Sequence, residues 1–177
     1  MRRTKASMKP STMVKVGVVC LVVNGLIFLF YALLVPVVVS GVHWLITLAA
    51  LLFLFALPAI YQSFHKVPNL VAKAVVLLLG LAMTILILSD VLFALSVLSG
   101  VNHDMAYALG SGVFILCVLA VGVLALKGAY FKWLGDLSIL TGVVGLLTYV
   151  VGGGGFLPIL SLMLLGLWSL AFGLNIR

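Results

Sequence analysis

The chain has 177 residues, of which 66% are hydrophobic and only 7% are charged. Soluble domains carry about 25% charged residues, so this composition excludes a soluble globular protein and indicates an integral membrane protein. The formal net charge of +7 does not indicate a nucleic-acid partner, because the basic residues lie at the ends of apolar segments, where topology determinants belong.

The first 13 residues are basic and polar and show no apolar periodicity. The apolar segment that follows continues to about Val39, well beyond the roughly 7–15 residues of a cleavable signal sequence. We therefore expect residues 1–13 to remain attached as a flexible cytoplasmic tail. Its basic residues, with the lysine that follows, are predicted to lie near lipid headgroups. They are Arg2, Arg3, Lys5, Lys9 and Lys15.

Residues 14–177 contain six apolar segments, each near the length of about 20 residues that a membrane-spanning helix requires. The short connections between them predict an all-α membrane protein, a bundle of six transmembrane helices arranged as three antiparallel hairpins. No stretch is left for a separate soluble domain. The expected spans are Val16–Val39, Trp44–Tyr61, Ala74–Ser99, Met105–Leu126, Trp133–Val151 and Leu157–Asn175.

The positively charged residues lie before the first span, between the second and third, between the fourth and fifth, and after the sixth. With six crossings, every Lys and Arg falls on one side of the membrane, which the positive-inside rule identifies as the cytoplasm. We therefore expect a multi-pass protein of the cell (plasma or inner) membrane, with both its N-terminus and its C-terminus cytoplasmic. The residues concerned are Arg2, Arg3, Lys5, Lys9, Lys15, Lys66, Lys73, Lys127, Lys132 and Arg177.

Two polar residues inside the spans are candidates for a ligand or ion path. Asp90 lies in the third span, where a carboxylate costs at least about 2.5–3.5 kcal/mol to insert and is usually functional. It either faces such a path or pairs with a neighbouring hydroxyl or amide. Asn24, in the first span, is a secondary polar contact for a solute, or forms a hydrogen bond between helices.

The residues near the predicted hairpin ends include two histidines. His43, His103 and Asp104 are weak candidates for a metal site, but they lack the spacing of a metal-binding motif. We expect no metal and no cofactor. Asn102 or Asp104 is instead predicted to cap the fourth span.

Small residues in the last three spans recur at helical spacing. In lipid such residues let helices approach closely, so we expect them to pack helices of this chain or of a partner. The predicted packing residues are Gly110, Gly112, Gly135, Gly142, Gly145, Gly166 and Gly173.

No catalytic motif is present in its required context, and three carboxylates are few for acid–base chemistry, so we expect a protein that is not an enzyme. The first hypothesis is an accessory or structural subunit that packs with partner membrane proteins, or with itself, among membrane lipids. The alternative is a small-solute or ion transporter or channel that uses Asp90.

Overall fold

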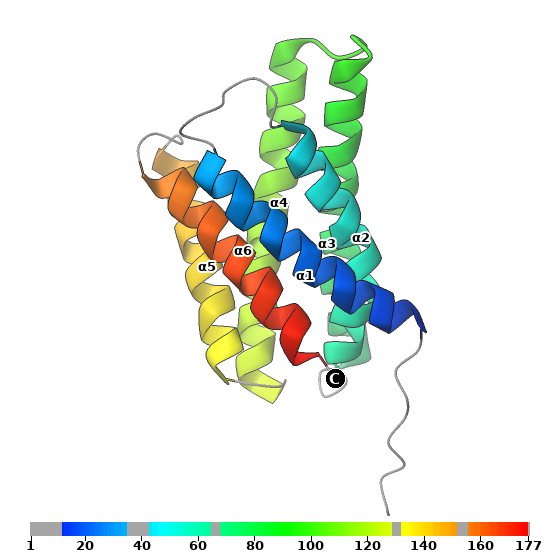
Figure 1. Cartoon of the computed structure of the whole chain (residues 1–177), viewed down its shortest axis with the longest axis vertical. Coiled ribbons are helices and arrows are strands. Elements are labelled where there is room, and N and C mark those ends of the chain that lie inside the picture. The colour runs from blue at the N-terminus through cyan, green and yellow to red at the C-terminus, as the bar shows by residue number, and fades with distance from the viewer. Residues whose placement is uncertain (1–11, 35–42, 65–67, 129–131, 152–155, 177) are drawn as a thin grey trace, which may run out of the picture.

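The computed structural model describes residues 12–34, 43–64, 68–128, 132–151 and 156–176. These residues form six helices, and Figure 1 shows them side by side in a bundle, with successive helices running in opposite directions. The helices are α1 (Thr12–Leu34), α2 (His43–Ser63), α3 (Asn69–Ala94), α4 (Gly100–Gly128), α5 (Lys132–Val151) and α6 (Leu157–Asn175).

Each helix is long and apolar enough to cross a membrane, with spans of 19 to 27 residues. The prediction of an all-helical, multi-pass membrane protein is confirmed at this level. A helix suits lipid because it satisfies its backbone N–H and C=O groups internally. Hydroxyl groups within the spans do the same: Thr84 and Thr148 each donate a hydrogen bond to the carbonyl one turn earlier.

The turn between α3 and α4 closes α3 with a specific backbone motif. Beyond Ala94 the chain reaches Ser96, whose φ of 58° is left-handed. The Ser96 N–H donates to the Phe93 carbonyl, and the Val97 N–H donates to the Leu92 carbonyl, each at 2.9 Å. This is the Schellman arrangement, which satisfies carbonyls that would otherwise be left unpaired at the end of a helix.

Two boundary predictions at this turn are wrong. The third helix does not continue to Ser99, because Ser96, rather than the glycine at position 100, takes the left-handed conformation that ends it. Asn102 and Asp104 do not cap the fourth helix, because α4 already begins at Gly100 and contains both. The Ser99 hydroxyl instead accepts a hydrogen bond from the Asn102 N–H at 3.4 Å.

The helices pack as a closed ring. Each contacts the helix before and after it in the chain, and α1 also packs against α6. Aromatic side chains cross the interior: Phe53 lies edge-to-face with Phe114, with ring centroids 5.3 Å apart, and stacks on Trp168 at 6.0 Å. The Trp168 indole N–H donates to the Ser138 hydroxyl at 2.5 Å. One aromatic cluster thus joins α2, α4, α5 and α6.

The contact between α1 and α6 is unusually close. A methyl group added at Gly25 would lie 2.7 Å from the Gly166 carbonyl oxygen, and one at Gly166 would lie 2.9 Å from the Gly25 carbonyl oxygen. Backbones that approach this closely require glycine on both helices. Gly166 is among the predicted packing residues, whereas Gly25 is not.

Six of the seven predicted packing glycines lie tightly against a neighbouring helix of this chain. A methyl group at any of them would come within 3.1 Å of another heavy atom. Gly112 differs, because a methyl group there would lie 3.8 Å from Tyr149, an ordinary contact. The six are Gly110, Gly135, Gly142, Gly145, Gly166 and Gly173.

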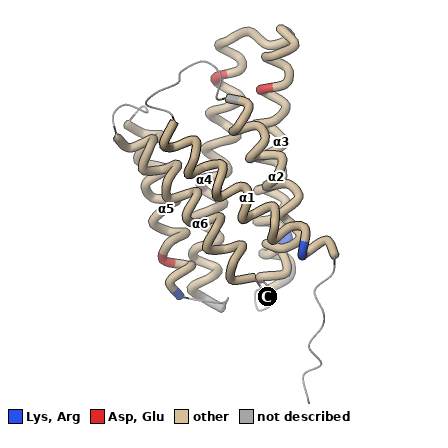
Figure 2. The backbone as a smooth tube through the Cα atoms, viewed as in Figure 1, with Lys and Arg blue, Asp and Glu red and all other residues tan. Residues whose placement is uncertain are grey.

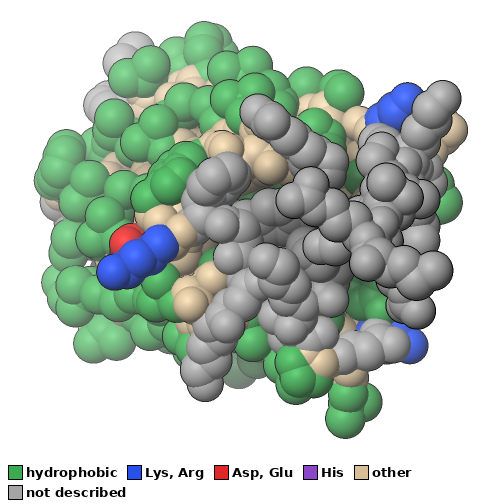
Figure 3. All heavy atoms as spheres, turned by 90° about the horizontal axis from the view of Figure 1, so that it is seen from below, with side chains coloured by type: hydrophobic (Ala, Val, Ile, Leu, Met, Phe, Trp, Pro, Cys, Tyr) green, Lys and Arg blue, Asp and Glu red, His purple; other side chains and the backbone are tan. Residues whose placement is uncertain are grey.

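The lysines are segregated along the bundle. Lys15, Lys73 and Lys132 are exposed and stand near the first residues of α1, α3 and α5. Figure 2 shows the described Lys positions at the end of the bundle opposite the turn between α3 and α4. Figure 3, a view from the lysine end, shows hydrophobic side chains around the sides of the molecule. Such sides suit contact with lipid.

Candidate functional site

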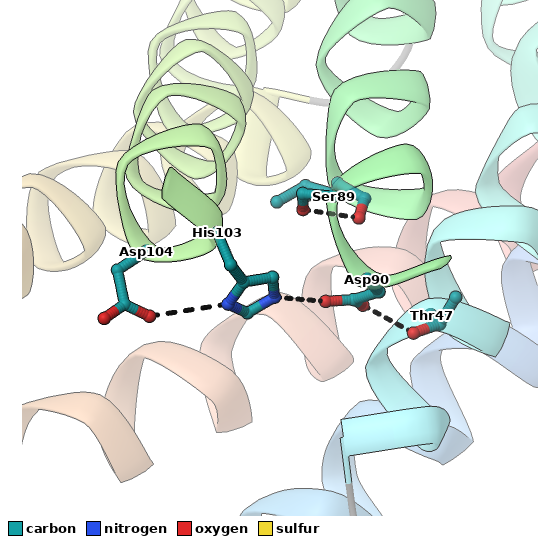
Figure 4. A network of polar contacts seen from close by, with 6 residues as sticks. Thr47, Ser89, Asp90, His103 and Asp104 are labelled. Atoms are coloured by element: carbon teal, nitrogen blue, oxygen red, sulfur yellow. Dashed lines mark hydrogen bonds and ion pairs between the residues drawn. The ribbon is translucent and has the colours of Figure 1, made fainter. Parts of the chain in front are cut away.

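Asp90 lies in a network of polar side chains from three helices. The Thr47 hydroxyl, on α2, donates to Asp90 Oδ2 at 2.5 Å. His103, on α4, places Nε2 3.0 Å from Asp90 Oδ1 and Nδ1 3.4 Å from an oxygen of Asp104. Figure 4 shows Asp90 between Thr47 and His103. We call Thr47, Asp90, His103 and Asp104 the Asp90 network.

The network is buried at Asp90 and open at Asp104. The side chains of Asp90 and His103 are 10% and 15% exposed, whereas that of Asp104 is 83% exposed. The His103 ring packs against Phe93, with centroids 4.5 Å apart, and faces Tyr107 at 5.9 Å. A buried carboxylate is costly unless its oxygens are paired, and here both oxygens of Asp90 have partners.

A central cavity of about 150 Å³ lies inside the ring of helices. Every helix contributes to its lining, and one residue from each helix illustrates this: Phe28, Ala50, Leu86, Tyr107, Thr141 and Ser161. The lining is mainly apolar, and none of the described residues that form it is charged. Tyr107 belongs both to this lining and to the surroundings of His103, so the cavity and the Asp90 network adjoin.

Four residues with hydroxyl groups line the cavity, and they differ in whether the hydroxyl group forms a hydrogen bond. Ser111 and Thr141 donate to carbonyls of their own helices, at 3.1 Å and 2.7 Å. Tyr107 and Ser161 form no hydrogen bond within the described part of the chain. Tyr107 on α4 and Ser161 on α6 are therefore the lining residues whose hydroxyl groups lack a hydrogen-bond partner in this part of the chain.

Asn24 joins three helices and lies apart from the Asp90 network. Its side chain is fully buried on α1. The amide nitrogen donates to the Ala49 carbonyl of α2 at 2.5 Å, and the amide oxygen accepts a hydrogen bond from Ser169 of α6 at 3.1 Å. Asn24 does not line the cavity. Asn24 thus forms hydrogen bonds that connect α1 to α2 and α6.

The weak metal candidates do not form a metal site within the described part of the chain. There, no group of three or more His, Cys, Asp or Glu side chains is arranged to hold a metal ion. His103 and Asp104 are neighbours in the Asp90 network instead. His43 begins α2, but its side chain lies outside the described residues.

The residues predicted to contact lipid headgroups fall mostly outside the described part of the chain. Arg2, Arg3, Lys5 and Lys9 precede its first residue, Thr12. Lys15 is described, and its side chain is exposed near the start of α1.

Sequence reasoning missed Thr47, Tyr107 and Ser161, and it did not pair Asp90 with His103. A signal for that pair exists. In an antiparallel hairpin, residues at equal distances from the turn lie opposite each other, and Asp90 and His103 are nearly symmetric about Ser96 and Val97. The hydroxyl residues carry no comparable signal, because single Thr, Tyr or Ser residues are common in apolar helices.

Comparison with protein-family models, with curated proteins and with solved structures found no match to this chain. The cavity and the Asp90 network are therefore the features that bear on its function.

Proposed function

We propose that this protein is a transporter that carries a small, mainly apolar solute in exchange for protons. The observation that supports this proposal is the central cavity, which all six helices line and which shares Tyr107 with the Asp90 network. Ligand sites in helical proteins typically lie in such mainly apolar cavities between helices, with a few polar groups for orientation. A site that touches every helix is sensitive to their relative movement.

The Asp90 network supplies the groups that can hold and release a proton. Asp90 and His103 are adjacent titratable groups on α3 and α4, and Thr47 connects them to α2. Chains of Asp and His within membrane spans are typical of proton relays in transporters. The network ends at the exposed Asp104, from which water can reach His103.

The hypothesis of an accessory subunit has less support from the packing. That hypothesis predicts glycine faces that dock helices of this chain or of a partner, and most of these glycines pack against helices of this chain. The exposed surface carries many large apolar side chains suited to lipid.

For orientation, we propose that both termini are cytoplasmic, that the six helices form three hairpins, and that the protein resides in the cell membrane. The lysines at one end of the bundle support this, since positive charge near the membrane is enriched on the cytoplasmic side. The basic tail then lies at the inner leaflet, where each Lys or Arg contributes about 1 kcal/mol of attraction to anionic lipid.

Proteoliposomes with a pH gradient and an internal pH indicator test the transport proposal. A small apolar solute diffuses back through lipid, so coupled exchange is expected to appear as a sustained proton flux that depends on added solute. A panel of uncharged single-ring compounds is suitable. The Asp90→Asn variant is expected to abolish this flux.

The matched control is Asp136→Asn, which changes an exposed carboxylate near the start of α5, distant from the network in sequence and outside the cavity lining. It is expected to retain the flux. If no solute in the panel induces a proton flux, or if Asp90→Asn and Asp136→Asn behave alike, the proposed transport mechanism is refuted.

A further inference from the structure

We infer that the central cavity binds an uncharged, single-ring molecule that carries one oxygen function, as phenol does. This inference rests on the proposed function for its biological meaning, but it concerns binding alone. It follows from the volume of the cavity, from its apolar and aromatic lining, and from two lining residues whose hydroxyl groups have no partner among the described residues.

The volume sets the size of the ligand. An apolar cavity of about 150 Å³ accommodates benzene, so a single ring fits this one. Phe28 and Phe114 lie in the lining, and aromatic rings pack favourably against one another. The ligand is therefore expected to be ring-shaped and mainly apolar.

The lack of charged residues in the described lining determines whether the ligand can be charged. None of the described lining residues is charged, and both oxygens of the nearby Asp90 already have partners in Thr47 and His103. A charged ligand would lose its hydration without gaining a counter-ion, which is costly in an apolar interior. The occupant is therefore uncharged.

The hydroxyl groups set its polar function. Tyr107 and Ser161 line the cavity from α4 and α6 without hydrogen bonds in the described part of the chain. Each hydroxyl can both donate and accept. A single oxygen on the ligand can pair with either, whereas a hydrocarbon leaves both unpaired. The site should therefore prefer phenol to toluene, which has nearly the same shape.

Binding of 4-fluorophenol and 4-fluorotoluene to the protein in lipid nanodiscs, followed by ¹⁹F NMR against empty nanodiscs, tests this inference. At equal concentrations in the lipid, the protein is expected to prefer the phenol by about three- to tenfold, the range given by one net hydrogen bond. Tyr107→Phe, Ser161→Ala and their combination are expected to reduce this preference while toluene binding persists.

Ala50→Leu adds volume to the lining and is expected to weaken the binding of both compounds. That result would show that both compounds occupy the cavity. Equal affinity for phenol and toluene, or a preference that survives the double variant, overturns the inference and leaves the transport proposal intact. Conversely, binding as expected, without a proton flux from any solute of the panel, supports the inference and refutes the transport proposal.

Discussion

The contact between α1 and α6 makes a quantitative prediction, because it closes the ring of helices. In Gly25→Ala, the new methyl group would lie 2.7 Å from the Gly166 carbonyl oxygen and 2.8 Å from the Leu170 backbone nitrogen. Both are backbone atoms, which cannot rotate away as a side chain can. The two helices must therefore move apart, which loosens their packing over several turns.

The size of the effect follows from two opposing terms. Overpacking of a tight interior costs about 1–3 kcal/mol. Replacing a helical glycine with alanine restores up to about 1 kcal/mol of helix propensity. Gly112→Ala isolates the second term, because a methyl group there would lie 3.8 Å from its nearest neighbour, Tyr149. Since propensity is common to both variants, their difference measures the steric cost alone.

We expect Gly25→Ala to be less stable than Gly112→Ala by about 1–3 kcal/mol, the cost of overpacking. Unfolding in mixed micelles with increasing sodium dodecyl sulfate, followed by tryptophan fluorescence, gives the free energy of unfolding of each variant. Circular dichroism of the folded proteins checks that both retain their helices. Equal stability of the two variants would refute the conclusion that α1 and α6 meet at their backbones.

Three further results are expected. Ser96→Gly should raise the free energy of unfolding by about 1 kcal/mol in the same assay, because glycine adopts the φ of 58° without a steric penalty; a decrease would contradict this account of the turn. Asn24→Leu should lower it by about 1–2 kcal/mol, because two hydrogen bonds to other helices are lost; an unchanged value would show that those bonds contribute little. Single cysteines at Lys66 and Lys127 should react with a membrane-impermeant maleimide from the same side of the membrane, against a low background because both native cysteines are buried; reaction from opposite sides would refute the proposed orientation.

The features predicted well from sequence depend on composition averaged over many residues. Six apolar segments predict six spans, because each helix in lipid requires about 20 apolar residues. The predicted and observed bounds of the last helix agree, since Pro158 marks its first turn. In the first helix, Gly17, Cys20, Asn24 and Phe28 recur at helical spacing and are all buried. Helical periodicity thus identifies a packed face even in a helix that is apolar all round.

The features missed depend on single backbone conformations and on contacts between distant residues. Glycine usually takes the left-handed position at the end of a helix, so Ser96 gave no sign that α3 ends before it. The close contact of α1 with α6 joins the two ends of the chain, and Gly25 stands alone rather than in a repeated pattern. The bond from Thr47 to Asp90 also required the arrangement of three helices.

A polar group that is costly to bury must have a hydrogen-bond partner within the protein. Such a group does not by itself mark the place where a ligand binds. Asp90 is costly to bury within a span, and Thr47 and His103 already pair with its two oxygens. The hydroxyls of Tyr107 and Ser161 cost far less to bury, yet they line a cavity and have no partner in the described part of the chain. A group that folding leaves unsatisfied beside a cavity is the better indicator of a ligand, because a bound molecule can supply the missing hydrogen bond. Asp90 is then expected to act on the solute indirectly, through His103 and Tyr107, rather than by contact.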